Sequence, residues 1–235
     1  MTFSRLELEV CANGIDSALA AQEAGVDRIE LCEHLELDGL TPAHKVIEKT
    51  RRQLHIPIHV LLRPRASNFV YSKKEFEVMK EDVRYCKAYG AHGIVFGILK
   101  EDGTVDLERC AEMLLKAKPF SCTFHRAFDL VQDPLLALEQ LIAMGFDRIL
   151  TSGQQPNCLE GSEMIAKLFK QAAGRISIMA GGGITEENIA EVVKRSHTNA
   201  FHFSTKKKLA DGSFVSDLNR IRKIKEIAEK AFYAQ

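Results

Sequence analysis

Two short segments of the chain each carry a carboxylate and a thiol two residues apart. Glu9-Val10-Cys11 recurs as Glu30-Leu31-Cys32, and each copy ends a short apolar run that is typical of a β-strand. Because side chains along a strand alternate between its two faces, the carboxylate and the thiol of each copy point to the same side. If the two strands are neighbours, two carboxylates and two thiols converge on one surface, where they could bind a metal ion or move protons.

The two thiols, Cys11 and Cys32, allow two interpretations. Paired thiolates select Cu(I) or Zn²⁺. Cu(I) fits better, because it tolerates lower coordination and two thiols alone do not complete a tetrahedral zinc site. The alternative is burial without function, since free cysteine is among the most buried residue types and packs as a small hydrophobe. The pattern therefore indicates Cys11 and Cys32 as candidate copper ligands and leaves simple burial open.

An almost uninterrupted alternation of apolar runs and amphipathic stretches must position these residues. Strands are expected at 6–11, 28–32, 58–62, 93–96, 121–125, 148–152, 176–180 and 200–204. Helices are expected at 17–24, 42–52, 73–89, 106–117, 134–144, 159–172, 186–194 and 217–231. Helix starts are expected at Thr41-Pro42, Asp133-Pro134 and Thr185-Glu186, because each pair begins with a side chain that can cap a helix.

Eight strands that alternate with about eight helices predict a (β/α)8 barrel, the TIM-barrel fold, as a single domain over residues 1–235. No linker, low-complexity stretch or change of composition divides the chain. An open doubly wound sheet is the alternative. It is less favoured, because the glycine pattern of a dinucleotide-binding turn does not follow the first strand.

Active sites in such barrels lie at the C-terminal ends of the strands. Apolar residues occupy the helix-facing positions of the first two strands, which leaves Glu9 and Glu30 facing the interior. Charged groups inside a barrel are costly unless they are paired or solvated at the mouth, so these groups are either functional or neutralise one another. The candidate catalytic residues at the strand ends are Glu9, Glu30, Arg63, Arg65, His125, Asp129 and His202.

Three of these candidates have an explicit structural alternative. Arg63 and Arg65 are suited to binding a carboxylate or a phosphate group. The alternative for this pair is an ion pair with Glu9 or Glu30. His125 lies in the densest polar stretch at any strand end, and it is a candidate general base or metal ligand. The alternative for His125 is a hydrogen-bonded structural histidine.

Glycines and hydroxyls after the last three strands indicate an anion site. Glycines at the turn after the seventh strand let backbone N–H groups approach an anion, and phosphate commonly binds in this region of the fold. A simple tight turn is the alternative. The predicted anion-binding residues are Ser152, Gly153, Gly181, Gly182, Gly183 and Ser204. The basic cluster Lys206-Lys207-Lys208 is either a solvated loop or a phosphate contact.

The overall composition excludes some classes of partner. Lys+Arg and Asp+Glu both number 32, so the net charge is zero and no nucleic-acid partner is expected. No apolar run approaches the ~20 residues of a membrane span, and the N-terminus lacks the pattern of a secretory signal. The six scattered cysteines are expected to be reduced thiols, which is typical of a cytoplasmic protein.

Several motifs along the chain together resemble the CutC family, whose members are named copper homeostasis proteins. The matching segments include Leu8–Cys11 (LEVC), Asp27–Cys32 (DRIELC), Arg63–Arg65 (RPR), Thr123–Asp129 (TFHRAFD), Leu150–Gly153 (LTSG) and Gly181–Ile184 (GGGI). The resemblance covers nearly the whole chain and implies a (β/α)8 barrel, a cytoplasmic location and a homo-oligomer. It also implies copper binding through cysteines, which correspond to Cys11 and Cys32 here.

These observations support two functional hypotheses. The first is a copper-binding homeostasis protein, on the basis of the resemblance and the two converging thiols. The second is an enzyme that acts on a small phosphorylated or carboxylated metabolite, with an anion bound at Gly182-Gly183 and a carboxylate or His125 moving a proton. A third alternative is an oligomeric scaffold, which predicts neither tight metal binding nor specific anion binding.

Overall fold

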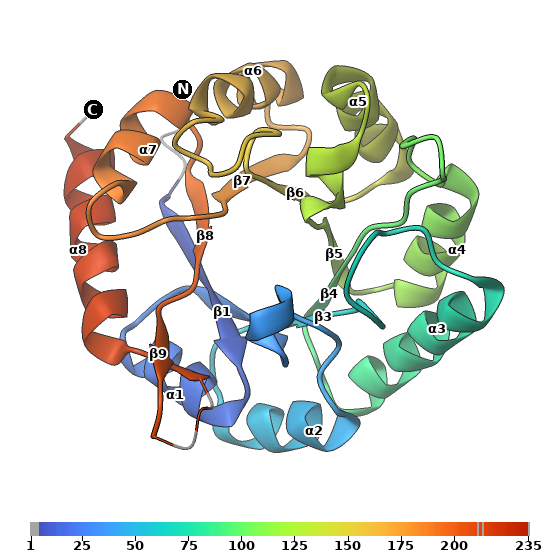
Figure 1. Ribbon diagram of the computed structural model, residues 1–235, viewed down its shortest axis with the longest axis horizontal. Helices are drawn as coiled ribbons and strands as arrows, with labels where there is room; N and C mark the ends of the chain where they lie inside the picture. Colours follow the sequence, from blue (N-terminus) through green and yellow to red (C-terminus); the bar gives the residue numbers. More distant parts are fainter. Residues whose placement is uncertain (1–4, 211, 213, 235) are drawn as a thin grey trace.

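Parallel pairing of each strand with the next, and of the last strand with the first, closes an eight-stranded barrel in the order β1-β2-β3-β4-β5-β6-β7-β8. The computed structural model describes residues 5–210, 212 and 214–234 and shows the helices as an outer ring around this barrel (Figure 1). The predicted (β/α)8 fold is therefore confirmed, and the alternative of an open sheet is wrong.

The strands and helices follow one another along the chain as a repeated βα unit. The barrel strands are β1 Glu7–Asn13, β2 Arg28–Cys32, β3 Ile58–Leu61, β4 Gly93–Phe96, β5 Ser121–Phe124, β6 Arg148–Thr151, β7 Ser177–Gly181 and β8 Ala200–Phe203. The helices are α1 Ile15–Glu23, α2 His44–Gln53, α3 Lys73–Ala88, α4 Leu107–Ala117, α5 Pro134–Met144, α6 Ser162–Ala172, α7 Ile189–Ser196 and α8 Leu218–Tyr233. Among the described helices, none is long and apolar enough to cross a membrane.

Three further elements lie in the loops at the C-terminal ends of the strands. Two short 3₁₀ helices, η1 Leu35–Leu37 and η2 Arg126–Leu130, follow β2 and β5. A two-stranded hairpin of β9 Lys206–Lys208 and β10 Phe214–Ser216 stands between β8 and α8. The three lysines of β9 are exposed, and Lys206 Nζ donates a hydrogen bond to the Leu35 carbonyl oxygen at 2.8 Å.

One of the three predicted helix starts is confirmed and two are wrong. Asp133 caps α5, where its carboxylate accepts hydrogen bonds from the Leu135 and Leu136 N–H groups. The Thr41 hydroxyl instead accepts a hydrogen bond from the Arg63 N–H, so it ties two loops together and α2 begins only at His44. The chain likewise makes an additional turn after Thr185 before α7 begins at Ile189.

Alternation along the strands divides the barrel into an apolar outer layer and a polar interior. Leu8 and Val10 in β1 and Ile29 and Leu31 in β2 are buried in the hydrophobic core that includes the surrounding helices. The residues between them face the interior. Glu9 pairs in register with Arg28 of β2 on one side and with His202 of β8 on the other, while Cys11 pairs with Glu30. The register therefore places acid, base and thiol groups at adjacent levels of one wall.

Candidate functional site

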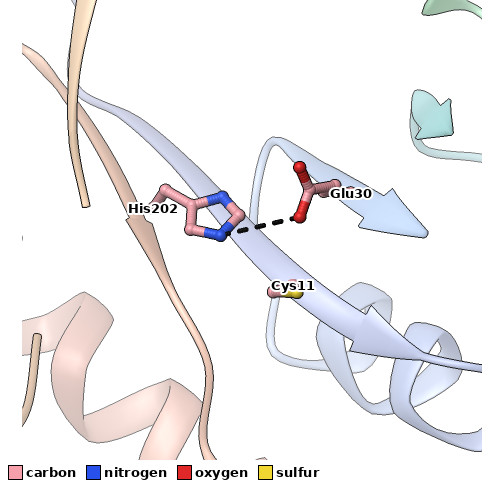
Figure 2. A group of neighbouring side chains, drawn as sticks. All are labelled: Cys11, Glu30 and His202. Atoms are coloured by element: carbon pink, nitrogen blue, oxygen red, sulfur yellow. Dashed lines mark ion pairs between the residues drawn. The ribbon is translucent and has the colours of Figure 1, made fainter. Parts of the chain in front are cut away.

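Three potential metal ligands converge where β1, β2 and β8 meet. The Cys11 sulfur, a Glu30 carboxylate oxygen and a His202 ring nitrogen all lie within 4.8 Å of one another (Figure 2). His202 Nε2 lies 3.8 Å from Glu30 Oε2. The sequence predicted Cys11 as a copper ligand and Glu30 and His202 as catalytic candidates, and the structure brings them into one cluster.

The second predicted copper ligand, Cys32, lies directly beside this cluster. Its sulfur is 3.4 Å from the Cys11 sulfur, and both thiols are buried. The hydrogen bond with Cys32 and burial together raise the pKa of Cys11 well above its ordinary value, so this thiol is protonated at neutral pH. A soft metal ion at this position would displace that proton.

Glu9 orients the imidazole of His202. Its carboxylate contacts His202 Nδ1 at 2.7 Å, and its other oxygen contacts Arg28 Nε at 2.6 Å. Burial alone would raise the pKa of Glu9, but Arg28 and His202 outweigh burial and hold that pKa well below its usual range. An ionised Glu9 therefore fixes Nδ1 of His202 as a donor and leaves Nε2 directed to Glu30.

The two other groups of the cluster are shifted toward their protonated forms. Burial raises the pKa of Glu30. Burial lowers the pKa of His202, but the negative charge of Glu30 and the contacts with Cys11 and Glu9 outweigh burial and raise it well above its ordinary value. His202 therefore carries a proton on this wall near neutral pH, which suits either proton transfer or exchange of that proton for a metal ion.

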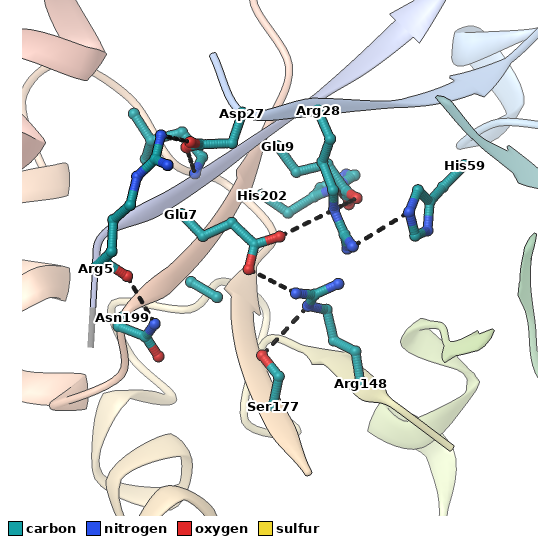
Figure 3. A network of polar contacts seen from close by, with 12 residues as sticks. Arg5, Glu7, Glu9, Asp27, Arg28, His59, Arg148, Ser177, Asn199 and His202 are labelled. Carbon is teal, nitrogen blue, oxygen red and sulfur yellow. Dashed lines mark hydrogen bonds and ion pairs between the residues drawn. The ribbon is translucent and has the colours of Figure 1, made fainter. Parts of the chain in front are cut away.

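A network of buried ion pairs lies deeper in the barrel (Figure 3). Arg28 contacts both Glu9 and Glu7, and Arg148 Nη2 contacts Glu7 Oε2 at 2.6 Å. His59 approaches Arg28 Nη1 at 3.5 Å, and burial together with the Arg28 charge lowers its pKa to about 3. Arginines of the barrel strands, and not those of a loop, therefore neutralise the inward carboxylates.

The suggested ion pairs of Arg63 and Arg65 with Glu9 or Glu30 are wrong. Arg63 follows the end of β3 and donates from Nη1 to carbonyl oxygens that include those of Leu37 and Gly39. Arg65 forms its ion pair with Glu75 at the start of α3, at 2.6 Å. Both side chains lie beyond the last strand residue, so they organise the loops and do not reach down into the barrel.

The strand ends also surround a cavity of about 640 Å³ at the barrel mouth. Of the predicted site residues, it is lined by Cys11, Glu30, Arg63, His125, Asp129, Gly182, Gly183, His202 and Ser204. Arg126 and Arg220 add positive charges that the sequence analysis did not single out as site residues, and Lys206 of the basic cluster adds another. Arg65, Ser152, Gly153 and Gly181 do not line it, and Glu9 and Cys32 lie behind its wall.

Asp129 and Ser152 anchor one side of this mouth. The Asp129 carboxylate accepts hydrogen bonds from Thr151 Oγ1 at 2.5 Å and from the Ser152 N–H at 2.9 Å, and it pairs with Arg126 Nε at 2.8 Å. The charge of Asp129 is thus balanced by Arg126 within the protein. Gly153 packs directly on the backbone of Gly161, where a side chain would overlap, which explains a glycine there without an anion.

The comparisons with known proteins agree with this geometry. The model of the CutC family matches residues 6–207. The chain belongs to the CutC family. The copper homeostasis protein cutC homolog of Homo sapiens is 46% identical over 199 residues, covering 85% of this chain and 73% of the human protein. A CutC family protein of Treponema denticola is 43% identical over 208 residues, covering 88% of this chain and 85% of its own length.

Solved structures support the same fold. The crystal structure of CutC from Streptococcus agalactiae superposes with a TM-score of 0.80 at 32% identity, covering 84% of this chain and 98% of the other. Phosphoribosylanthranilate isomerase from Thermotoga maritima has a TM-score of 0.62 at 12% identity, covering 96% of this chain and 99% of the other, which shows a shared barrel fold alone. CutC membership thus agrees with the resemblance in the motifs.

Proposed function

We propose that this CutC protein binds one Cu(I) ion through Cys11, Cys32 and His202 at the barrel mouth. The proposal is carried by the convergence of the Cys11 thiol with a His202 ring nitrogen within 4.8 Å, with the Cys32 sulfur 3.4 Å from that of Cys11. Relatives at 46% and 43% identity are named for copper homeostasis or for CutC, which supports copper as the ion. In this function the ion is cargo that the protein holds or passes on.

The donor set suits Cu(I) better than other common metal ions. Thiolate sulfur is a soft ligand that selects Cu(I), and imidazole also binds copper. The two sulfurs, of Cys11 and Cys32, are 3.4 Å apart before any ion binds. A structural zinc site would require four ligands in a tetrahedron, and a magnesium or calcium site would require mainly oxygen ligands.

Glu9 would orient the metal ligand His202 and would not itself bind the ion. Metal-binding histidines usually donate their second ring N–H to a carboxylate, which fixes the ring orientation and raises its basicity. Glu9 makes this contact with His202 Nδ1 at 2.7 Å, which leaves Nε2 for the ion.

Titration of the reduced protein with Cu(I) against a competing chelator tests the proposal. We expect the double variant Cys11→Ser/Cys32→Ser to lose affinity by at least about a hundredfold, because even outer-shell changes cost roughly 10–100-fold. Cys122→Ser is the control, since that thiol faces the outer apolar layer from β5 and hydrogen-bonds the Phe120 carbonyl oxygen. Unchanged affinity in the double variant would disprove this site.

A separate prediction concerns Glu9. Glu9→Gln should weaken Cu(I) binding roughly tenfold, because the amide no longer supplies a charged acceptor to His202. The measurement is the same chelator competition, accompanied by the free energy of unfolding, which separates loss of the ion site from loss of the fold. Wild-type affinity in a folded Glu9→Gln protein would show that the charge of Glu9 does not act on the ion through His202.

A further inference from the structure

One wall of the barrel-mouth cavity consists of hydrogen-bond donors, several of which have no acceptor within the described part of the chain. The wall is formed by His125, Arg126, Gly182 and Gly183, and all four line the cavity. It is separate from the thiols of the proposed copper site. The cavity of about 640 Å³ is far larger than a metal ion requires and has room for a small metabolite.

The proton of His125 can be placed from its hydrogen bond. The Ala127 N–H donates to His125 Nδ1 at 3.1 Å, so in the neutral ring the proton is on Nε2. His125 is 5% exposed, and Nε2 has no partner among the described residues. Burial and the Arg63 charge lower the pKa of His125 to about 3, so the ring stays neutral near pH 7. An unused buried donor is costly, and a bound ligand would explain it.

The structure also explains why His125 occupies this position. A Cβ at Gly97 would lie 2.6 Å from His125 Nδ1, so only glycine leaves room for the ring. The Phe69 ring covers the other side, with a centroid distance of 4.7 Å. The imidazole is therefore held in place before any ligand binds.

Two consecutive glycines supply further donors. Gly182 and Gly183 have φ values of 107° and 74°, a conformation that other residues rarely adopt. Neither N–H group has an acceptor within the described residues. Successive N–H groups in such a turn form a concave site for an anion. The Arg126 guanidinium packs against this turn, because a Cβ at Gly182 would lie 3.2 Å from its Cζ atom.

Arg126 is fixed in that position. Its Nε pairs with Asp129 Oδ2 at 2.8 Å, and its Nη2 donates to Ser152 Oγ at 3.1 Å. The Asp129 carboxylate accepts further hydrogen bonds from Thr151 Oγ1 and the Ser152 N–H, and its charge is balanced by Arg126. The wall thus presents a neutral imidazole N–H, two backbone N–H groups and one oriented guanidinium whose charge is balanced by Asp129.

We propose that this wall binds the oxyanion group of a small metabolite, a phosphate monoester or a carboxylate, with His125 as a neutral hydrogen-bond donor and not as a base. Glu30 and His202 line another part of the same cavity, so the other end of the bound molecule would lie toward them. The proposal goes beyond copper binding and does not depend on it, since it uses neither thiol.

Two variants of His125 separate ligand binding from a structural role. His125→Asn keeps an acceptor near the Nδ1 position for the Ala127 N–H but removes the donor at Nε2. His125→Gln extends an amide N–H toward the Nε2 position but loses the acceptor. Inorganic phosphate and acetate are the two probes, and calorimetric titration measures their affinities in wild type and variants. The probe that binds with the higher affinity indicates whether the site prefers a phosphate group or a carboxylate.

We expect wild type to bind one of the two probes, His125→Asn to bind it at least about tenfold more weakly, and His125→Gln to retain most of the affinity. Cu(I) affinity should be unchanged in His125→Asn, and the probe should still bind to Cys11→Ser/Cys32→Ser. Failure of both probes to bind wild type overturns the oxyanion site. Full binding by His125→Asn with loss in His125→Gln overturns the role of Nε2 as the donor.

Discussion

Replacing Arg28 with methionine is expected to lower the free energy of unfolding by about 3–5 kcal/mol near neutral pH. Arg28 is the cation between Glu7 and Glu9, and its side chain is 7% exposed while that of Glu9 is 1% exposed. Methionine fills much of the same space but leaves Glu9 as a buried charge whose remaining ion-pair contact is with His202. Urea unfolding at pH 7 measures the change.

The pH dependence of this loss has a defined sign. In the wild type, the pKa of Glu9 lies below its ordinary value near 4.5, so Glu9 contributes stability above that pH. This contribution disappears as the pH falls through the folded-state pKa. Without Arg28 the folded-state pKa of Glu9 rises, so the difference between wild type and variant should be largest above about pH 5 and shrink under more acidic conditions.

An exposed ion pair provides the matched control for Arg28→Met. The Arg5 side chain is 83% exposed and pairs with Asp27 at 2.6 Å. Arg5→Met should change the free energy of unfolding by less than about 1 kcal/mol, because water screens the pair. Equal changes in the free energy of unfolding for Arg28→Met and Arg5→Met would contradict the stabilisation of a buried Glu9 charge by Arg28.

Replacing Gly161 with alanine should cost about 3 kcal/mol of unfolding free energy. A Cβ at Gly161 would overlap the carbonyl oxygen of Ser152, and the backbone of Gly153 lies next to it. Ser152 cannot easily give way, because its N–H donates to Asp129 and its hydroxyl donates to the Gln155 carbonyl oxygen. The loop between β6 and α6 would have to open, and chemical denaturation would report the loss.

Gly174→Ala separates this steric effect from the general cost of replacing glycine. Gly174 has φ of 77°, and a Cβ there would meet nothing within 4 Å. Alanine at this position should cost only about 1 kcal/mol, from backbone strain. Gly161 has φ of −84°, so its requirement for glycine comes from close approach alone. Losses of the same size in the two variants would contradict this distinction.

The barrel could be predicted from the sequence because its signals are local. Alternating apolar residues such as Leu8 and Val10 define the outer face of β1, and a glycine at the end of a helix, such as Gly145, marks the turn into the next strand. The convergence of Cys11 and Glu30 followed from the same alternation once the strands were taken as neighbours. These features depend on residues close together in the chain.

The partners of the inward carboxylates could not be predicted in this way. Which cation faces Glu9 depends on the register between β1 and β2, and closure of the whole barrel sets that register. Alternation along β2 puts Arg28 on the same face as Glu30, but its pairing with Glu9 requires the stagger that places the two residues opposite each other. Arg148 reaches Glu7 across the interior from β6, which is a contact between residues 141 positions apart.

The same distinction applies to His125. Its place at the end of β5 was evident from the sequence, whereas its proton position depends on the Ala127 N–H in a 3₁₀ turn, and its space depends on Gly97 after β4. A short polar motif identified the residue, but only three-dimensional neighbours distinguish a donor from a base.

The ion-pair network of Glu7, Arg28 and Arg148 also determines how the mouth can be used. These side chains lie in the barrel beneath the cluster of Cys11 and His202 and do not line the cavity, so we expect the cavity to open only at the mouth. An ion and a small metabolite would have to enter and leave by the same route, and the one bound deeper could not depart while the other remained. Exchange at this site would therefore follow a compulsory order of release.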